Sequence, residues 1–430
     1  MTEIGGLKAR LIRGGIGSLG MRLAQATLGL MISVMIARML GPEGVGTYGT
    51  TLAILAVVLI PMQAGVARLL VREAPRREAS ADWEGLSGIF SWANRSVILF
   101  TVLCLTAMIG MGDLAAARAD GWMQAIALGL AAAPVMAIGF VHSGILSGLK
   151  KVVRGQIFEV ARNLLLLLLL AALPLVKAQI TVLDAIILFG LANLGAAAMS
   201  VLLARRAIPQ PARSAPPSGE GWNHYRQVVP FALMGGIWTV ISSLDVIALR
   251  YLSTSAEVGY FHVANQICSL LLFGLAAIGL VASPYFSSMH AAGDRNALQL
   301  LARRSAQASL GFALPGAIFL WSSSAFLVPM VFGDEFSPSV WPITILAVGF
   351  VIQSSTGASG ALLAMSGHEG QTINATLWAF GLKLVALLAL APTFGASGVA
   401  GSVVVYYLVF NLLVRRACMR HLGVEVFALR

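Results

Sequence analysis

The chain has 430 residues, of which 58% are hydrophobic and 11% are charged, whereas soluble domains are about 45–50% apolar and about 25% charged. A water-soluble protein of this composition would aggregate, and the mean hydropathy of +0.85 excludes disordered, collagen-like and disulfide-scaffold classes. The 29 basic and 18 acidic residues give a net charge of +11, which in a membrane protein indicates cytoplasmic loops rather than nucleic-acid binding.

Twelve apolar runs are long enough to cross a bilayer, because one helical span needs about 20 apolar residues. In chain order they cover residues 16–37, 46–70, 87–110, 122–148, 156–176, 180–204, 227–250, 256–286, 305–331, 337–366, 372–392 and 395–414. The first run is too long for the core of a signal peptide, so we expect it to remain as a span. The sequence therefore predicts an all-α polytopic membrane protein with twelve transmembrane helices.

Basic residues are distributed unevenly between the two sides of the predicted spans. With the N-terminus placed in the cytoplasm, 20 of the 29 lie in cytoplasmic segments, 4 on the opposite side and 5 inside spans. This asymmetry predicts that both termini are cytoplasmic. A polar, proline-rich stretch at mid-chain predicts a linker. The expected domains are an N-terminal half at 1–204, a cytoplasmic linker at 205–226, a C-terminal half at 227–414 and a cytoplasmic tail at 415–430.

Similar segments recur at about half the chain length. Residues 36–48 resemble residues 247–260, with their Val-Gly pairs 213 residues apart, and residues 144–156 resemble 360–371 at offsets of 215 and 216. These matches predict a duplicated six-helix unit. Because each half has an even number of spans, both halves insert the same way. The result is a parallel repeat around a central cavity.

Small and polar residues form a stripe along the first predicted span and another along the equivalent seventh span. The first stripe consists of Ser18, Arg22, Gln25, Gly29 and Ser33, and the second of Gly235, Thr239, Ser242 and Asp245. An ionisable side chain at bilayer depth costs about 2.5–3.5 kcal/mol and needs water or a partner. Two polar faces at equivalent positions are what a cavity between halves requires, while helix packing through small residues is the alternative.

Other spans carry single polar residues. Arg95 lies about two turns inside span 3, where it can extend to the headgroups or enter a cavity. Glu159 and Arg162 in span 5 have the spacing of an ion pair on one helix face, with a role in the cavity as the alternative. Gln266 adds a polar group to span 8, and Lys383 at the middle of span 11 either pairs with an acid or offers its charge to a ligand.

The three cysteines lie far apart in the sequence, so neither a metal-binding spacing nor a disulfide framework is present. We read them as packing residues and expect neither a metal nor another cofactor. The Gly-rich stretch 14–20 lacks the lysine of an ATP-binding loop, so direct coupling to ATP is not expected.

Two loops and the twelve-span plan resemble a known family. The loops are Ile-Ala-Arg-Met-Leu-Gly-Pro-Glu-Gly-Val-Gly-Thr-Tyr at 36–48 and Ser-Gly-Leu-Lys-Lys at 147–151. With the Gly-rich first span they are similar to the polysaccharide-exporter branch, which includes O-antigen-type oligosaccharide flippases, of the multidrug/oligosaccharidyl-lipid/polysaccharide (MOP) exporter superfamily. The resemblance covers essentially the whole chain and is strongest over spans 1 to 5.

The resemblance implies movement of a polyprenyl-diphosphate-linked oligosaccharide across the bacterial inner membrane by alternating access. This step serves surface polysaccharide biosynthesis, such as that of lipopolysaccharide O-antigen or exopolysaccharide. The implied partners are the lipid-linked substrate, the membrane, and a polysaccharide polymerase or other assembly proteins, without nucleic acid. Arginine would suit the diphosphate because its planar guanidinium binds phosphate through two parallel hydrogen bonds.

The candidates for lining a substrate cavity are Arg22, Gln25, Ser18, Arg95, Arg162, Ser242, Gln266 and Lys383. Asp245 and Glu159 are the candidates for coupling transport to an ion.

Two other functions compete with this interpretation. A cation-coupled multidrug exporter of the same fold would favour an acidic interior, whereas the spans hold more bases than acids. A membrane glycosyltransferase or polysaccharide polymerase would need an acid, base or metal site, usually on a large outer loop. Every predicted outer loop is short, and the acidic pair Asp334-Glu335 is isolated. We therefore expect a transporter rather than an enzyme.

Overall fold

The computed structural model describes residues 2–117, 121–218 and 221–428. Ten helical stretches within those ranges are long and apolar enough to cross a membrane, and the same ranges contain no strand. The prediction of an all-α polytopic membrane protein is therefore confirmed. The chain divides into two compact units, unit 1 from Met1–Leu40 and Thr47–Ile247, and unit 2 from Gly41–Gly46 and Ala248–Arg430.

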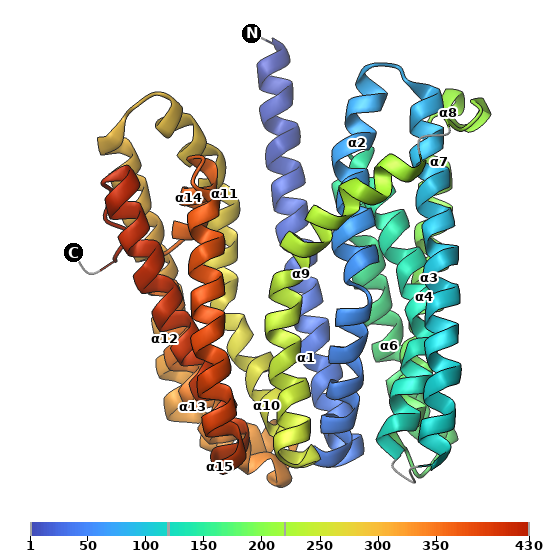
Figure 1. Ribbon diagram of the computed structural model, residues 1–430. Coiled ribbons are helices and arrows are strands. Elements are labelled where there is room, and N and C mark those ends of the chain that lie inside the picture. The colour runs from blue at the N-terminus through green and yellow to red at the C-terminus, as the bar shows by residue number, and fades with distance from the viewer. Residues whose placement is uncertain (1, 118–120, 219–220, 429–430) are drawn as a thin grey trace. The chain divides into compact units, whose positions relative to one another are not determined.

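Unit 1 is built from helices that follow the chain from its beginning (Figure 1). They are α1 (Thr2–Val58), the π-helical turn η1 (Pro61–Val66), α2 (Ala67–Ala79), α3 (Trp83–Ala117), α4 (Gly121–Gly148), α5 (Val152–Gly155), α6 (Ile157–Val176), α7 (Val182–Ala207), α8 (Gln210–Ser214) and α9 (Gly221–Leu252). The last turns of α9 belong to unit 2. Within the predicted linker 205–226, the structure has the end of α7, the short helix α8 and the start of α9.

Helix α4 lies at the core of unit 1, where it packs against α2, α3 and α7. Small side chains permit this close approach, because alanine and glycine let helix backbones come together in a membrane. Ala133 and Ala137 of α4 and Ala196 of α7 are completely buried. Phe158 of α6 fills the space over Gly139 of α4. This packing fixes the first turns of α6 beside α4, and those turns carry the polar residues described below.

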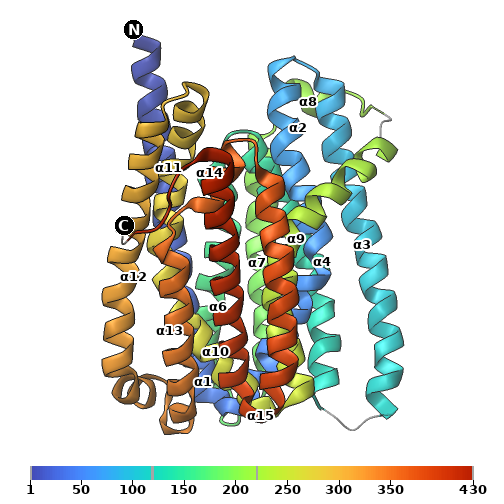
Figure 2. The ribbon, with the colours of Figure 1, turned by 60° about the vertical axis from the view of Figure 1, so that its left-hand side comes forward.

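Unit 2 contains the remaining helices, of which α13 packs against α12 and α15 (Figure 2). In order they are α10 (Ser255–Ser269), the 3-10 turn η2 (Leu270–Leu272), α11 (Phe273–Ala291), α12 (Arg295–Phe332), the 3-10 turn η3 (Asp334–Ser339), α13 (Val340–Ser355), α14 (Ser359–Met365), α15 (Glu369–Ala417) and the π-helical turn η4 (Cys418–Leu422).

Two of the ten candidate spans are long because they run through a kink. The kink in α1 is at Gly41, with φ of 65°, and the kink in α15 is at Gly395, with φ of 53°. These positions are where the sequence separates predicted spans 1 and 2, and spans 11 and 12. The predicted span at 337–366 is divided into α13 and α14 by a turn at residues 356–358. The twelve-span layout in two repeats is compatible with these breaks and remains a prediction.

Two equivalent glycines of the predicted repeat pack reciprocally inside unit 2. A Cβ atom on Gly46 would overlap the carbonyl oxygen of Ser255, and a Cβ atom on Gly259 would overlap that of Pro42. The offset of 213 residues that relates Gly46 to Gly259 also relates Pro42 to Ser255. Only glycine permits both approaches. Such reciprocity is what equivalent segments of a duplicated unit would show.

The end of the described chain is an extended strap, residues 423–428, bound along unit 2. The amide of Gln299 in α12 forms two hydrogen bonds with the backbone of Glu425, at 2.7 and 2.6 Å. Arg415 donates two hydrogen bonds of 2.9 Å to the Glu425 carboxylate. The backbone N–H of Ala428 donates to the carbonyl of Ser355 at the end of α13. The strap therefore ties α12, α13 and α15 together.

Candidate functional site

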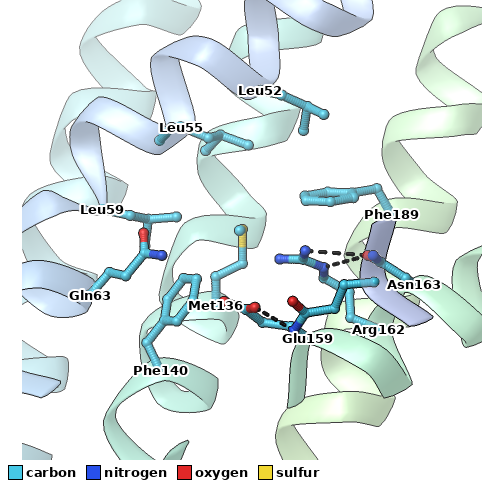
Figure 3. A pocket seen from close by; sticks show the side chains of 12 residues that line it. Leu52, Leu55, Leu59, Gln63, Met136, Phe140, Glu159, Arg162, Asn163 and Phe189 are labelled. Carbon is cyan, nitrogen blue, oxygen red and sulfur yellow. Dashed lines mark hydrogen bonds between the residues drawn. The ribbon is translucent and has the colours of Figure 1, made fainter. Parts of the chain in front are cut away.

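A pocket of about 330 Å³ lies inside unit 1. It is formed by α1, η1, α4, α6 and α7 (Figure 3). The apolar part of its wall consists of Leu52, Leu55, Ala56, Leu59, Met136, Phe140 and Phe189. The polar part consists of Gln25, Gln63, Glu159, Arg162 and Asn163. Ligand sites typically combine an apolar wall with a few convergent polar groups, and this pocket has that character.

Helix α6 supplies three of the polar side chains from its first two turns. Glu159, Arg162 and Asn163 fall on one face because residues three and four apart lie together on a helix. All three are half-buried. Leu164 and Leu168, which follow in α6, are exposed, as expected for a helix that meets lipid on one side. The apolar run that makes α6 a candidate span thus begins with a short polar surface.

The Glu159 carboxylate is linked to the first helix of the chain. Gln25 of α1 donates a hydrogen bond from Nε2 to Glu159 Oε2 at 2.7 Å. This bond joins two spans that are far apart in the sequence. The sequence places Gln25 on a polar stripe, and in the structure this member of the stripe lines the pocket.

The Arg162 guanidinium is held by an amide and by two rings. Its Nε and Nη2 donate to Asn163 Oδ1 at 3.3 and 3.2 Å. Its central carbon lies 6.0 Å from the ring centres of Phe158 and Phe189, at the outer limit of cation–π attraction. Since a guanidinium carries five N–H donors, several remain for a ligand. In Figure 3 the group points into the pocket beside Phe189.

The spacing of Glu159 and Arg162 allows a helix-surface ion pair, but the structure arranges them otherwise. Among the described residues the two groups make no ion pair within 4 Å, and each has a neutral amide as its hydrogen-bonding partner. The reason is tertiary for the carboxylate, because α1 brings Gln25 to Glu159, and local for the guanidinium, which is hydrogen-bonded to the neighbouring Asn163. Both charges therefore face the pocket.

The structure brings Gln25, Glu159 and Arg162 together and leaves the other predicted residues of unit 1 elsewhere. Arg22 and Arg95 are exposed and do not line this pocket. On α9, Ser242 is exposed and Asp245 is buried. The side chain of Ser18 lies outside the described residues.

In unit 2, Gln266 is half-buried on α10, and Lys383 is buried on α15. The ammonium of Lys383 lies 5.7 Å from the ring centre of the buried Tyr406. Lys383 is therefore part of the packed interior of unit 2, where only 3% of its surface is accessible.

Polar side chains form a largely buried hydrogen-bonded cluster at the break between α13 and α14. Asn411 of α15 donates to Gln353 Oε1 at 2.8 Å, and the Thr356 hydroxyl donates to Asn411 Oδ1. Ser359 donates to the Thr356 hydroxyl oxygen at 3.4 Å. We call these four residues the α13–α14 cluster. These hydrogen bonds connect α15 to the break between α13 and α14 and stabilise the broken helix.

Sequence reasoning did not identify several pocket residues. Asn163 follows Arg162 in an apolar run, and neighbours on a helix normally face different ways, so its bond to the guanidinium had no sequence signal. Gln63 follows Pro61, where the structure has a π-helical turn that exposes it. Phe189 of α7 is one apolar residue among many.

The parts of the chain that the structure describes contain no group of three or more His, Cys, Asp or Glu side chains suited to a metal ion. The cysteines are buried and unbonded to each other.

The family model described as polysaccharide biosynthesis protein matches residues 11–290. No curated protein matches the chain. An inward-facing MATE-family multidrug resistance transporter of the MOP superfamily has a TM-score of 0.76 at 16% identity, covering 93% of this chain and 94% of its own. The lipid II flippase MurJ, in an inward closed conformation, has a TM-score of 0.74 at 10% identity, covering 94% and 87%.

A third solved structure is a MOP-superfamily transporter from Pyrococcus furiosus, described as having a binding pocket of reverse polarity that suggests a different function. Its TM-score is 0.60 at 16% identity, covering 96% of this chain and 95% of its own. At these identities the likeness establishes the fold alone. That fold is the one shared by MATE transporters and the MurJ flippase.

Proposed function

Because this chain belongs to the polysaccharide biosynthesis protein family, we propose that it is a flippase for a polyprenyl-diphosphate-linked oligosaccharide. It would move this lipid between leaflets of the bacterial inner membrane during assembly of a surface polysaccharide, such as an O-antigen or an exopolysaccharide. The observation that carries the proposal is the pocket in unit 1, because an apolar cavity among spans with two charges and three amides suits a strongly hydroxylated headgroup. Neither a cofactor nor nucleic acid is needed.

The proposed cycle is alternating access. The headgroup enters from the cytoplasm, where both termini are expected, while the polyprenyl tail stays in lipid. Gln25 and Arg162 are the substrate-binding candidates that the pocket supports, and Arg22, Arg95, Ser242, Gln266 and Lys383 remain candidates without that support. Asp245, buried on α9, is the candidate for ion coupling. A polysaccharide polymerase is a fitting partner, since it consumes the product on the outer face.

A multidrug exporter is the second candidate. It is favoured by the similarity of fold to a MATE transporter and by the carboxylate of Glu159 in the pocket, which could hold an organic cation. It is weakened by Arg162 in the same pocket, because a fixed positive charge repels such a substrate.

The gene should be deleted and the lipids of the mutant extracted. A flippase predicts accumulation of a diphosphate-linked oligosaccharide and loss of surface polysaccharide, both restored by the wild-type gene but not by Arg162→Gln. Sensitivity to cationic drugs with normal lipids and normal polysaccharide would support the exporter and contradict the flippase. Mass spectrometry of the accumulated lipid would identify the glycan.

A further inference from the structure

Two opposite charges are kept apart in the pocket of unit 1. Glu159 and Arg162 are three residues apart on one face of α6, a spacing that ordinarily brings such side chains together. Instead Gln25 holds the carboxylate at 2.7 Å and Asn163 holds the guanidinium at 3.2 and 3.3 Å. Each charge thus has a neutral amide as its hydrogen-bonding partner in place of a direct ion pair, and both charged groups keep hydrogen-bonding capacity for a ligand.

The charge balance of the pocket is informative about that ligand. Of the twelve lining residues, Arg162 is the one base and Glu159 the one acid, so the lining has no net charge. A diphosphate accepts hydrogen bonds and cannot donate them when ionised, so it would gain from Arg162 but lie against the Glu159 carboxylate. In a site of low dielectric such like-charge contacts are strongly unfavourable. A pocket for the diphosphate would be expected to carry a positive net charge.

Sugar hydroxyls match the same groups better. A hydroxyl both donates and accepts, so one can donate to Glu159 while a neighbour accepts from Arg162. Gln25 and Gln63 can do either. The apolar part of the lining contains Phe140 and Phe189, which suit the apolar faces of sugar rings. The volume of about 330 Å³ lies at the small end of ligand pockets. It fits a part of an oligosaccharide rather than the whole lipid-linked molecule.

We propose that this pocket is a subsite for uncharged sugar units of the glycan and that the diphosphate is bound elsewhere. Glu159 and Arg162 contact sugar hydroxyls, while Gln25 and Asn163 are positioning residues that keep the two charges from pairing. This proposal rests on the proposed flippase function.

A reporter thiol at the pocket allows a binding test without transport. Gln63 is exposed and lines the pocket, whereas the native cysteines Cys104, Cys268 and Cys418 are buried. The full-length Gln63→Cys protein, purified in detergent, is labelled with a maleimide, and the unsubstituted protein gives the background. The two probes are inorganic pyrophosphate and the oligosaccharide released by mild acid from the lipid that accumulates in the deletion strain.

We expect the released oligosaccharide to slow labelling by the factor 1 + [L]/Kd, about threefold at twice its dissociation constant, and pyrophosphate to leave the rate unchanged. Placing Glu159→Gln in the reporter protein gives the pocket a net positive charge, so pyrophosphate should now slow labelling. Adding Arg162→Gln should remove this new protection. Glu84→Gln, at an exposed glutamate in the first turn of α3, is the matched control and should behave like the reporter protein alone.

Protection of the reporter protein by pyrophosphate would overturn the proposal, as would failure of the released oligosaccharide to protect. Melting curves of each variant verify that it is folded. The flippase function fails separately, if the deletion strain accumulates no lipid-linked oligosaccharide. In that case the pyrophosphate measurements on Glu159→Gln still test the charge balance of the pocket.

Discussion

Polar side chains lie within membrane-spanning helices of both units, but their surroundings differ. In unit 1, Glu159 and Arg162 are half-buried and line a pocket, each with one neutral partner and with bonding capacity to spare. In the α13–α14 cluster of unit 2, Asn411 and Thr356 are buried and bonded to one another. The polar groups in the pocket of unit 1 thus remain accessible, whereas those of the α13–α14 cluster are bonded to neighbouring side chains and stabilise the fold.

The largest expected effect is on transport, from Arg162→Gln in the pocket. Hydrogen bonds to a charged group contribute about 1.5–3 kcal/mol, and 1.4 kcal/mol corresponds to tenfold in affinity. Transport should therefore fall about tenfold or more, while the melting temperature stays near that of the wild type. Arg162→Lys should restore little, because an ammonium lacks the planar fork.

Arg206→Gln, at an exposed arginine in the last turn of α7, is the matched control for Arg162→Gln and should transport normally. Surface polysaccharide per cell, normalised to protein in the membrane, is the measurement. Normal surface polysaccharide in cells with well-expressed Arg162→Gln protein would contradict a role for the unit 1 pocket in transport.

The structural role of the α13–α14 cluster is tested by Asn411→Leu. Removal of this amide leaves the buried Thr356 hydroxyl and the half-buried Gln353 oxygen without their partner, and a buried unsatisfied group costs about 1–3 kcal/mol. The melting temperature should fall, and transport per folded molecule should be retained. Asn374→Leu, at an exposed position of the same helix, is the matched control. Loss of transport with unchanged melting would mean that the cluster itself binds the substrate.

A smaller loss of stability is expected from Gly357→Ala at the turn between α13 and α14. Gly357 has φ of 58°, and an added Cβ would lie 2.6 Å from the backbone nitrogen of Ala306 in α12. Strain of this kind costs about 1–3 kcal/mol. By contrast, Gly381→Ala in α15 has open space around it and should be neutral or stabilising. Equal melting temperatures for the two variants would show that the turn is not tightly fixed.

Sequence reasoning reached much of this fold because the apolar runs and their breaks are local properties. Gly41 and Gly395 separate runs that the structure kinks at those glycines. The pocket was harder to predict. The polar stripe placed Gln25 on a face, but its partner Glu159 is 134 residues away, and contacts between helices leave no local pattern.

The surroundings of Lys383 could not be predicted from the sequence either. Its central position in a span was compatible with an acidic partner or with a ligand, and the structure adds that Lys383 is buried, with its ammonium 5.7 Å from the ring centre of Tyr406.

The smallest expected effect concerns pH and the strap. The hydrogen bonds from Arg415 lower the pKa of the Glu425 carboxyl below its ordinary value, outweighing the opposing effect of burial. A carboxyl with a lowered pKa in the folded state stabilises the fold above its unfolded pKa of about 4.3. That contribution is lost as the pH falls through the lowered folded pKa.

Because the pair is partly exposed, we expect at most about 1 kcal/mol. Melting temperature measured from pH 7 to pH 3 should decline less steeply at the acid end for Glu425→Gln than for the wild type. Parallel curves would contradict a stabilising role for this pair.

The most direct test of the flippase is translocation by the purified protein. It should be reconstituted into vesicles that contain the lipid-linked oligosaccharide from the deletion strain, with the glycan on the outer leaflet measured by its accessibility to a sugar-binding lectin. Wild-type protein should transfer the lipid between leaflets, and Arg162→Gln protein should transfer it about tenfold more slowly or worse. Transfer by the variant at the wild-type rate, or wild-type vesicles no faster than protein-free vesicles, would contradict the account.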